Sequence, residues 1–384
     1  MWRSWLAGAG LFVLGVLATM IIETLTNQSV SAVLRQRFKR KAAKELEQLT
    51  RDDDLIRLGD ECLYIHQFVP GGYERRNISL GLRGERPFVE AIAEADPDLL
   101  PVPAESLIAE VEARRALYDS DEHPTWNGDT VTVENIDSFI RDDVNESPVL
   151  RLVVSKGDYA TSQVCTERWQ QWFDAPGQVM PRDKPELFNG VPGLLNSIGL
   201  NATLVTDDDK LVLVKRNPRM SSGRSGWHIS VNEGMLPEDC VRDGELDPHV
   251  GLVRGVKEEL GIDIDPRCVK IHTAVLDMRR YQFGLLGHID LRGSRTSAAH
   301  VQRARMLGNA KDKSENARLS FIDWTYEDVR SKLLETEWIA HGWLNLILSA
   351  IQHFPSHRDE LSDLLTDRTV SFNARADAVR ASRD

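Results

Sequence analysis

The pattern of apolar and polar positions begins with a segment unlike the rest of the chain. Residues 5–22 form a run of 18 residues without a charge. As a helix this run would reach about 27 Å, enough to cross the core of a bilayer. Arg3 precedes the run, whereas six basic residues follow it (Arg35, Arg37, Lys39, Arg40, Lys41 and Lys44). Since basic residues stay on the cytoplasmic side, we expect residues 1–24 to be a single-pass inner-membrane (cell-membrane) anchor with cytoplasmic C-terminal domains; a cleaved signal peptide is the alternative.

Residues 25–50 carry an apolar residue at every third or fourth position (Val30, Leu34, Phe38, Ala42, Leu46 and Leu49). This spacing predicts a basic amphipathic helix. Three roles remain open for it: packing against the next domain, pairing between chains as a stalk, or resting on anionic lipid head groups.

Residues 51–189 mix two periodicities. Alternating or continuous apolar runs predict strands at 61–68, 130–133 and 149–154, and a helical period predicts helices at 87–96 and 104–118. A cluster of turn residues (Pro176, Gly177, Pro181 and Pro185) predicts a boundary near residue 189. The region is a mixed α+β segment without a chemical motif, either a separate domain or an extension of the next one.

Residues 190–355 alternate strand and helix patterns more regularly. We expect strands at 202–206, 211–215, 227–231, 269–276, 281–291 and 319–324, and helices at 247–260, 326–334 and 338–354. Helices on both faces of such a sheet predict an α/β/α sandwich. A charged tail, 356–384, follows.

Composition adds limits to this picture. The chain has 384 residues, enough for about two domains, and a net charge of −12. This charge argues against binding of a large nucleic acid, which requires a basic surface. The four cysteines form no C-x-x-C pair, so a zinc cluster is not expected.

The most informative segment is Arg-Gly-Val-Lys-Glu-Glu-Leu-Gly-Ile at 254–262. It resembles the end of the Nudix box, G-x5-E-x7-R-E-U-x-E-E-x-G-U, in which U is a bulky aliphatic residue. Six of the seven constrained positions in this half match. Trp227 and the pair Glu233-Gly234 also stand where the family has its Trp strand and its glycine pair. The resemblance covers residues 190–354 and implies a Nudix-like fold there.

Positions 255, 258 and 259 would share one face of a helix, because residues three and four apart are neighbours. The resemblance implies that carboxylates on this face hold Mg²⁺ or Mn²⁺, that Glu258 and Glu259 are catalytic and metal-binding, and that Arg254 holds Glu258 in place. It also implies a nucleotide ligand bound by Lys215, Arg216, Trp227 and Gly234, with the two cations and Arg224 as candidate phosphate ligands. Ordinary surface positions would equally explain these cations.

The sequence departs from the Nudix box at two places. Gly255 replaces the first carboxylate of the triad, and the segment 234–261 is six residues longer than the family spacing. Glu238 and Glu245 are both candidates for the early box glutamate, and Cys240 stands at its unshifted position. Glu233 or Glu315 could complete a metal site in place of Gly255.

A membrane anchor joined to a Nudix-like domain resembles effectors of cyclic-oligonucleotide anti-phage signalling (CBASS). This resemblance implies a receptor for a nucleotide or cyclic oligonucleotide that acts on the membrane as a homo-oligomer. A Mg²⁺-dependent hydrolase of a nucleoside diphosphate-linked substrate is the alternative, and a protein-binding scaffold is a third possibility.

Overall fold

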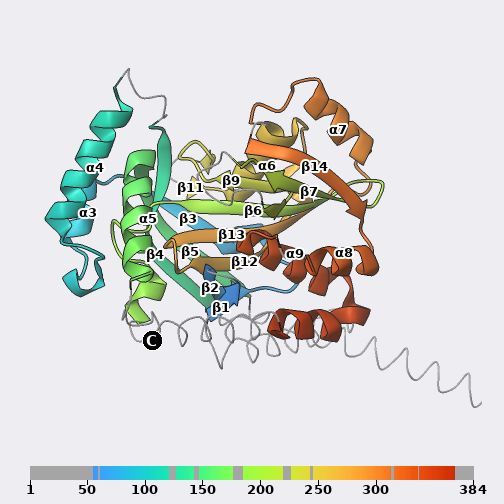
Figure 1. The fold of residues 1–384 in the computed structure, drawn as a ribbon, viewed down its shortest axis with the longest axis horizontal. Helices are drawn as coiled ribbons and strands as arrows, with labels where there is room; N and C mark the ends of the chain where they lie inside the picture. The colour runs from blue at the N-terminus through green and yellow to red at the C-terminus, as the bar shows by residue number, and fades with distance from the viewer. Residues whose placement is uncertain are drawn as a thin grey trace, which may run out of the picture. The chain divides into compact units, whose positions relative to one another are not determined.

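The computed structural model describes residues 55–58, 61–120, 127–141, 147–175, 185–218, 226–242, 245–312, 315–335 and 337–367, which form a mixed α/β protein (Figure 1). The expected anchor at 1–24 and the expected helix at 25–50 lie outside these residues. Within the described part, no helix is both long and apolar enough to cross a membrane. The expected tail begins as a helix at residues 358–367.

Nine described strands form the larger sheet, which we call sheet A. Its order is β1 (Leu55–Leu58), β2 (Glu61–Phe68), β12 (Val269–Asp277), β13 (Gln282–Asp290), β6 (Ile198–Val205), β7 (Lys210–Arg216) and β14 (Asn316–Asp323); β8 (Trp227–Ile229) pairs with β7, and β9 (Val231–Gly234) pairs with β6. β13 and β6 run parallel, whereas the other pairs run antiparallel. The predicted strand at 227–231 is thus two strands, divided at Ser230.

Helices cover both faces of sheet A. A side chain at Gly251 of α6 (Pro248–Leu260) would begin 2.5 Å from Leu200, and Ser349 of α9 (Ala340–His353) lies 3.2 Å from Thr203, hydroxyl to hydroxyl. Leu200 and Thr203 are an odd number of residues apart on β6, so they point to opposite faces. α7 (Ala298–Met306) lies with α6, and α8 (Tyr326–Leu333) lies with α9. The three layers expected for residues 190–355 are therefore present (Figure 1).

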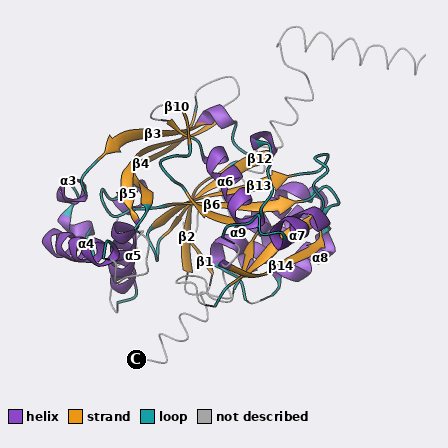
Figure 2. Cartoon of the chain, turned by 90° about the horizontal axis from the view of Figure 1, so that it is seen from above, coloured by secondary structure: helices purple, strands orange, loops and turns teal. Residues whose placement is uncertain are grey.

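The second sheet, sheet B, has the order β10 (Cys240–Arg242), β11 (Glu245–Leu246), β3 (Ile78–Glu85), β5 (Pro148–Asp158) and β4 (Asp129–Ile140). Its neighbouring helices are α3 (Phe88–Ala93), α4 (Ala104–Tyr118) and α5 (Tyr159–Phe173) (Figure 2). The strand at 61–68 and the helix at 104–118 match the expected bounds, whereas α5 and α7 were not predicted. The expected boundary at residue 189 does not separate the two sheets. β1 and β2, which precede it, belong to sheet A, and β10 and β11, which follow it, belong to sheet B.

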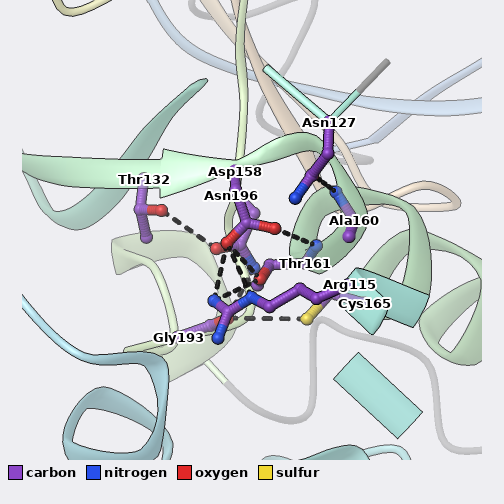
Figure 3. Close-up of polar contacts among 9 residues, drawn as sticks. All are labelled: Arg115, Asn127, Thr132, Asp158, Ala160, Thr161, Cys165, Gly193 and Asn196. Carbon is purple, nitrogen blue, oxygen red and sulfur yellow. Dashed lines mark hydrogen bonds and ion pairs between the residues drawn. The ribbon is translucent and has the colours of Figure 1, made fainter. Parts of the chain in front are cut away.

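Polar side chains tie α4, α5 and β4 to the loop that precedes β6 (Figure 3). Asp158 begins α5 by accepting a hydrogen bond from Thr161 N–H (3.0 Å), and it accepts another from Arg115 of α4 (Nη2–Oδ2 2.6 Å). Asn196 accepts from Thr132 of β4 (2.9 Å) and donates to the Gly193 carbonyl. Cys165 of α5 donates through Sγ to the same Gly193 carbonyl (3.6 Å), so α5 contacts this loop directly and α4 is linked to α5 through Asp158.

Candidate functional site

α6 positions the residues that resemble the Nudix box. It begins at Asp247, whose carboxylate accepts from His249 N–H (2.8 Å), with Pro248 in the first turn, and it ends at Gly261, whose φ of 76° favours glycine. Leu252, Val256 and Leu260 are fully buried. This apolar stripe fixes the rotation of the helix and so directs the charged residues towards β9 and its following loop.

Arg254 is the centre of an ion-pair network. Its Nε and Nη2 donate to the two carboxylate oxygens of Asp239 (2.9 Å each), and Nη2 also donates to the Gly234 carbonyl (2.6 Å). Its Nη1 donates to Glu258 (3.0 Å) and lies 3.2 Å from Glu233. These five contacts match the five N–H groups of a guanidinium. Arg254 therefore holds Glu258, as the sequence predicted, and three further groups besides.

The carboxylate that pairs with Arg254 is one that sequence reasoning missed. Asp239 is 1% exposed, whereas Glu238 and Glu245, the two candidates, are exposed. The extra residues of this segment form the hairpin β10–β11, which joins β3 of sheet B. The lengthened loop thereby shifts the partner carboxylate to one residue before Cys240. The only signal for Asp239 in the sequence was that it precedes Cys240, which stands at the unshifted position of the early box glutamate.

Glu259 is buried and faces the interior. Its two carboxylate oxygens accept from Asn232 N–H (2.8 Å) and from the Asn316 side chain (2.9 Å). Burial raises the pKa of Glu259 to about 8, and the nearby charges of Glu233 and Glu315 add to the rise. Its carboxyl group is therefore shared with amides on β9 and β14 and is largely protonated at neutral pH.

We expect Glu259 to make stability depend on pH. Its folded pKa lies above the unfolded value, so its contribution is full below about pH 4.5 and is lost as the pH rises through about 8. In Glu259→Gln the pH-dependent contribution should vanish. Asn316, whose Oδ1 has no hydrogen-bond partner among the described residues, can turn its amide so that Oδ1 accepts from the new NH₂ group. Thermal unfolding between pH 5 and 9 should therefore show a melting temperature that falls more in the wild type than in E259Q; parallel curves would contradict this assignment.

Glu233 fills the space that Gly255 leaves. A side chain at position 255 would begin 2.8 Å from Glu233 Cβ, 3.0 Å from Glu233 Cγ and 3.0 Å from Val231 Cγ1. Burial raises the pKa of Glu233, and Glu258 contributes to the rise. The Glu233 side chain of β9 therefore occupies the space that a side chain at position 255 of α6 would fill. A side chain at position 255 and Glu233 in its present position exclude each other.

The four expected metal ligands do not converge on one point. Glu258 and Glu233 contact Arg254, Glu259 is turned to amides, and Glu315 accepts from Arg216 (3.0 Å). In the part of the chain that the structure describes, no three His, Cys, Asp or Glu side chains are arranged to hold a metal ion. As placed, these residues do not fit Mg²⁺ or Mn²⁺, because Glu258 and Glu233 are directed to the guanidinium of Arg254 and Glu259 to amides, so their oxygens do not converge as a cation requires.

The expected ligand-binding residues separate into two groups. Lys215 and Trp227 lie together, with Lys215 Nζ 5.4 Å from the centroid of the indole ring, and Lys332 of α8 lies closer, at 3.3 Å. Arg216 is 5% exposed and pairs with Glu315, and Gly234 belongs to the Arg254 network. Lys332 is a further candidate that no local motif in the sequence indicates. Arg224 lies outside the described residues.

No family model matches this sequence, and no curated protein matches it. Over part of its length the structure is similar to several solved structures, among them a MutT protein and a MutT/nudix family protein. DR0079 from Deinococcus radiodurans has 13% identity and a TM-score of 0.27, with 40% of this chain and 82% of that chain covered. The MutT protein from Methanosarcina mazei Go1 has 12% identity and a TM-score of 0.26, with 39% and 89% covered. The MutT/nudix family protein from Enterococcus faecalis has 12% identity and a TM-score of 0.29, with 51% of this chain and 78% of that chain covered.

Proposed function

We propose that this protein is a membrane-anchored receptor that binds a nucleotide or cyclic oligonucleotide without cutting it, and that ligand binding acts on the membrane as an anti-phage response. The sequence motif at 254–262 and the uncharged run at 5–22 supply the two parts of this proposal. In this proposal residues 190–355 bind the ligand. The anchors of several chains come together in a homo-oligomer and act on the membrane.

One observation carries the preference for binding over cutting. Arg254 is saturated by Asp239, Glu233, Glu258 and the Gly234 carbonyl, and Gly255 has no carboxylate to offer. A cation-assisted hydrolase needs carboxylates that are available to the cation, whereas recognition of a nucleotide does not.

The proposal is tested with the full-length protein in lipid nanodiscs. Binding of a panel of cyclic di- and trinucleotides is measured by calorimetry, and toxicity is measured in cells that express the protein and are supplied with the ligand. We expect at least one cyclic nucleotide to bind and to cause growth arrest only when residues 1–24 are present. If no member of the panel binds, the receptor function is wrong; if the bound ligand never causes arrest, the effector role is wrong.

The alternative is a Mg²⁺-dependent hydrolase, and one observation favours it. Three carboxylates, those of Asp239, Glu233 and Glu258, surround the single guanidinium of Arg254, so the network keeps negative charge that a cation could neutralise. Release of phosphate from dinucleoside and sugar-nucleotide substrates with Mg²⁺ or Mn²⁺ tests the alternative. Turnover that disappears in Glu259→Gln would establish the hydrolase and exclude a receptor without activity.

A further inference from the structure

A row of side chains crosses three neighbouring strands at one end of sheet A. In the strand register, Arg318 of β14 lies opposite Lys215 of β7, and Lys215 lies opposite Trp227 of β8. Residues directly opposite each other point to the same face, with Cβ atoms about 4.5–5.5 Å apart. Lys332 of α8 adds a third cation over the Trp227 ring. We call Arg318, Lys215, Trp227 and Lys332 the cationic row.

This arrangement is unfavourable for the protein on its own. Like charges directly opposite each other in a sheet are destabilising, and Arg318 and Lys215 are such a pair. The Lys332 side chain is only 9% exposed, and burying an ammonium group is costly. Burial lowers the pKa of Lys332, and the charges of Lys215 and Arg318 lower it further. A site that departs from local stability in this way is a candidate for function.

The counter-ions of the row are exposed glutamates on one loop. Glu337 accepts from Lys215 (2.7 Å) with 65% of its side chain exposed, and Glu335 accepts from Lys332 (2.9 Å) with 46% exposed. Ion pairs this exposed contribute little to stability. Among the described residues Arg318 forms no ion pair, so the row retains positive charge.

We propose that the cationic row binds a phosphate ester dianion, which displaces Glu337 from Lys215. A phosphate ester carries up to two charges and three terminal acceptor oxygens, which suits three convergent cations better than a carboxylate would. The ester is the terminal phosphate of a linear nucleotide, within the ligand class of the proposed function, on which this identification rests; the phosphodiester of a cyclic oligonucleotide has only one charge and two terminal oxygens. A phosphomonoester lipid head group carries the same chemistry. Consecutive residues of a strand point to opposite faces of the sheet. Lys215 of the cationic row pairs with Glu337, whereas Arg216, the next residue of β7, pairs with Glu315. The cationic row is therefore separate from the acidic network around Arg254.

The site is tested by titrating inorganic phosphate, and separately AMP, into the full-length protein in zwitterionic nanodiscs, observed by ³¹P NMR. Arg318→Glu should weaken phosphate binding at least tenfold and yet raise the melting temperature by about 1–2 °C, because it replaces a like-charge pair with an opposite one. Glu337→Gln should strengthen binding several-fold. Arg303→Glu, the same change at an exposed position of α7, should leave phosphate binding unchanged.

The outcomes separate this site from the proposed function. Phosphate binding that is equal in the wild type and R318E, or absent from the wild type, overturns the site even if cyclic nucleotides still bind elsewhere. If phosphate binds the wild type and binds R318E more weakly, the site is supported. If, in addition, no nucleotide binds the wild type, the nucleotide function is overturned and the phosphate site is not. Competition with phosphate by phosphatidic acid in the nanodisc, but not by AMP, would assign the row to a lipid head group; the reverse would assign it to a nucleotide.

Discussion

Asp239→Ala should lower the free energy of unfolding by about 3–5 kcal/mol, the usual cost of removing one partner from a buried ion pair. Asp239 is 1% exposed and accepts two hydrogen bonds from Arg254 and one from Leu236 N–H (2.9 Å). Without it the guanidinium keeps its charge in a half-buried position but loses its bidentate partner. Chemical denaturation monitored by circular dichroism measures the change.

The neighbouring residue provides the matched control for Asp239. Glu238 has the same charge and is exposed, so Glu238→Ala should change the free energy of unfolding by no more than about 0.5 kcal/mol. Equal effects of the two substitutions would contradict Asp239 as the partner of Arg254, and a larger effect at Glu238 would restore one of the two candidates for the early box glutamate, Glu238 and Glu245.

The second large effect is expected at Gly255. Gly255→Glu places a side chain within 2.8–3.0 Å of Glu233 and Val231 and adds a carboxylate beside two others. Overpacking of this kind costs about 1–3 kcal/mol, and the like charge adds to it, so we expect a loss of about 3 kcal/mol in the same denaturation experiment. The loss identifies Glu233 as the group that occupies the space of a helix carboxylate.

Removal of Glu233 tests that identification. In the double variant Glu233→Gly, Gly255→Glu the space is vacated, and most of the lost stability should return. Gly81→Gln is the control for adding a long side chain at a glycine, because a Cβ there meets nothing within 4 Å among the described residues and the amide adds no charge opposite Glu245; it should be nearly neutral. If the double variant is no more stable than G255E, the two positions are not coupled.

The sequence predicted those elements whose pattern is local and regular. The helix at 104–118 and the helix at 247–260, with its proline start and glycine end, follow from capping and periodicity. α5 was missed because its buried face includes Thr161, Ser162 and Cys165 among apolar residues, which weakens the stripe. α7 is short and basic, with only Val301 and Ala304 buried.

The site was predictable only in part, for a related reason. The pairing of Arg254 with Glu258 is a local property of a helix and was expected from their spacing. The roles of Asp239 and Lys332 depend on which segments meet in space: a hairpin that joins sheet B brings the first to Arg254, and α8 brings the second over Trp227. Likewise, the row of Arg318, Lys215 and Trp227 exists only in the order β14–β7–β8, which no pattern along the chain specifies.

The most direct test of the account is the fate of a bound ligand. A labelled cyclic nucleotide that binds the full-length protein is incubated with an excess of that protein and Mg²⁺ for several hours, and the ligand is then released and separated by chromatography. Because the carboxylates around Arg254 are held in internal ion pairs, we predict that the ligand is recovered intact. Recovery of a cleaved product, which Glu259→Gln abolishes, would contradict the account.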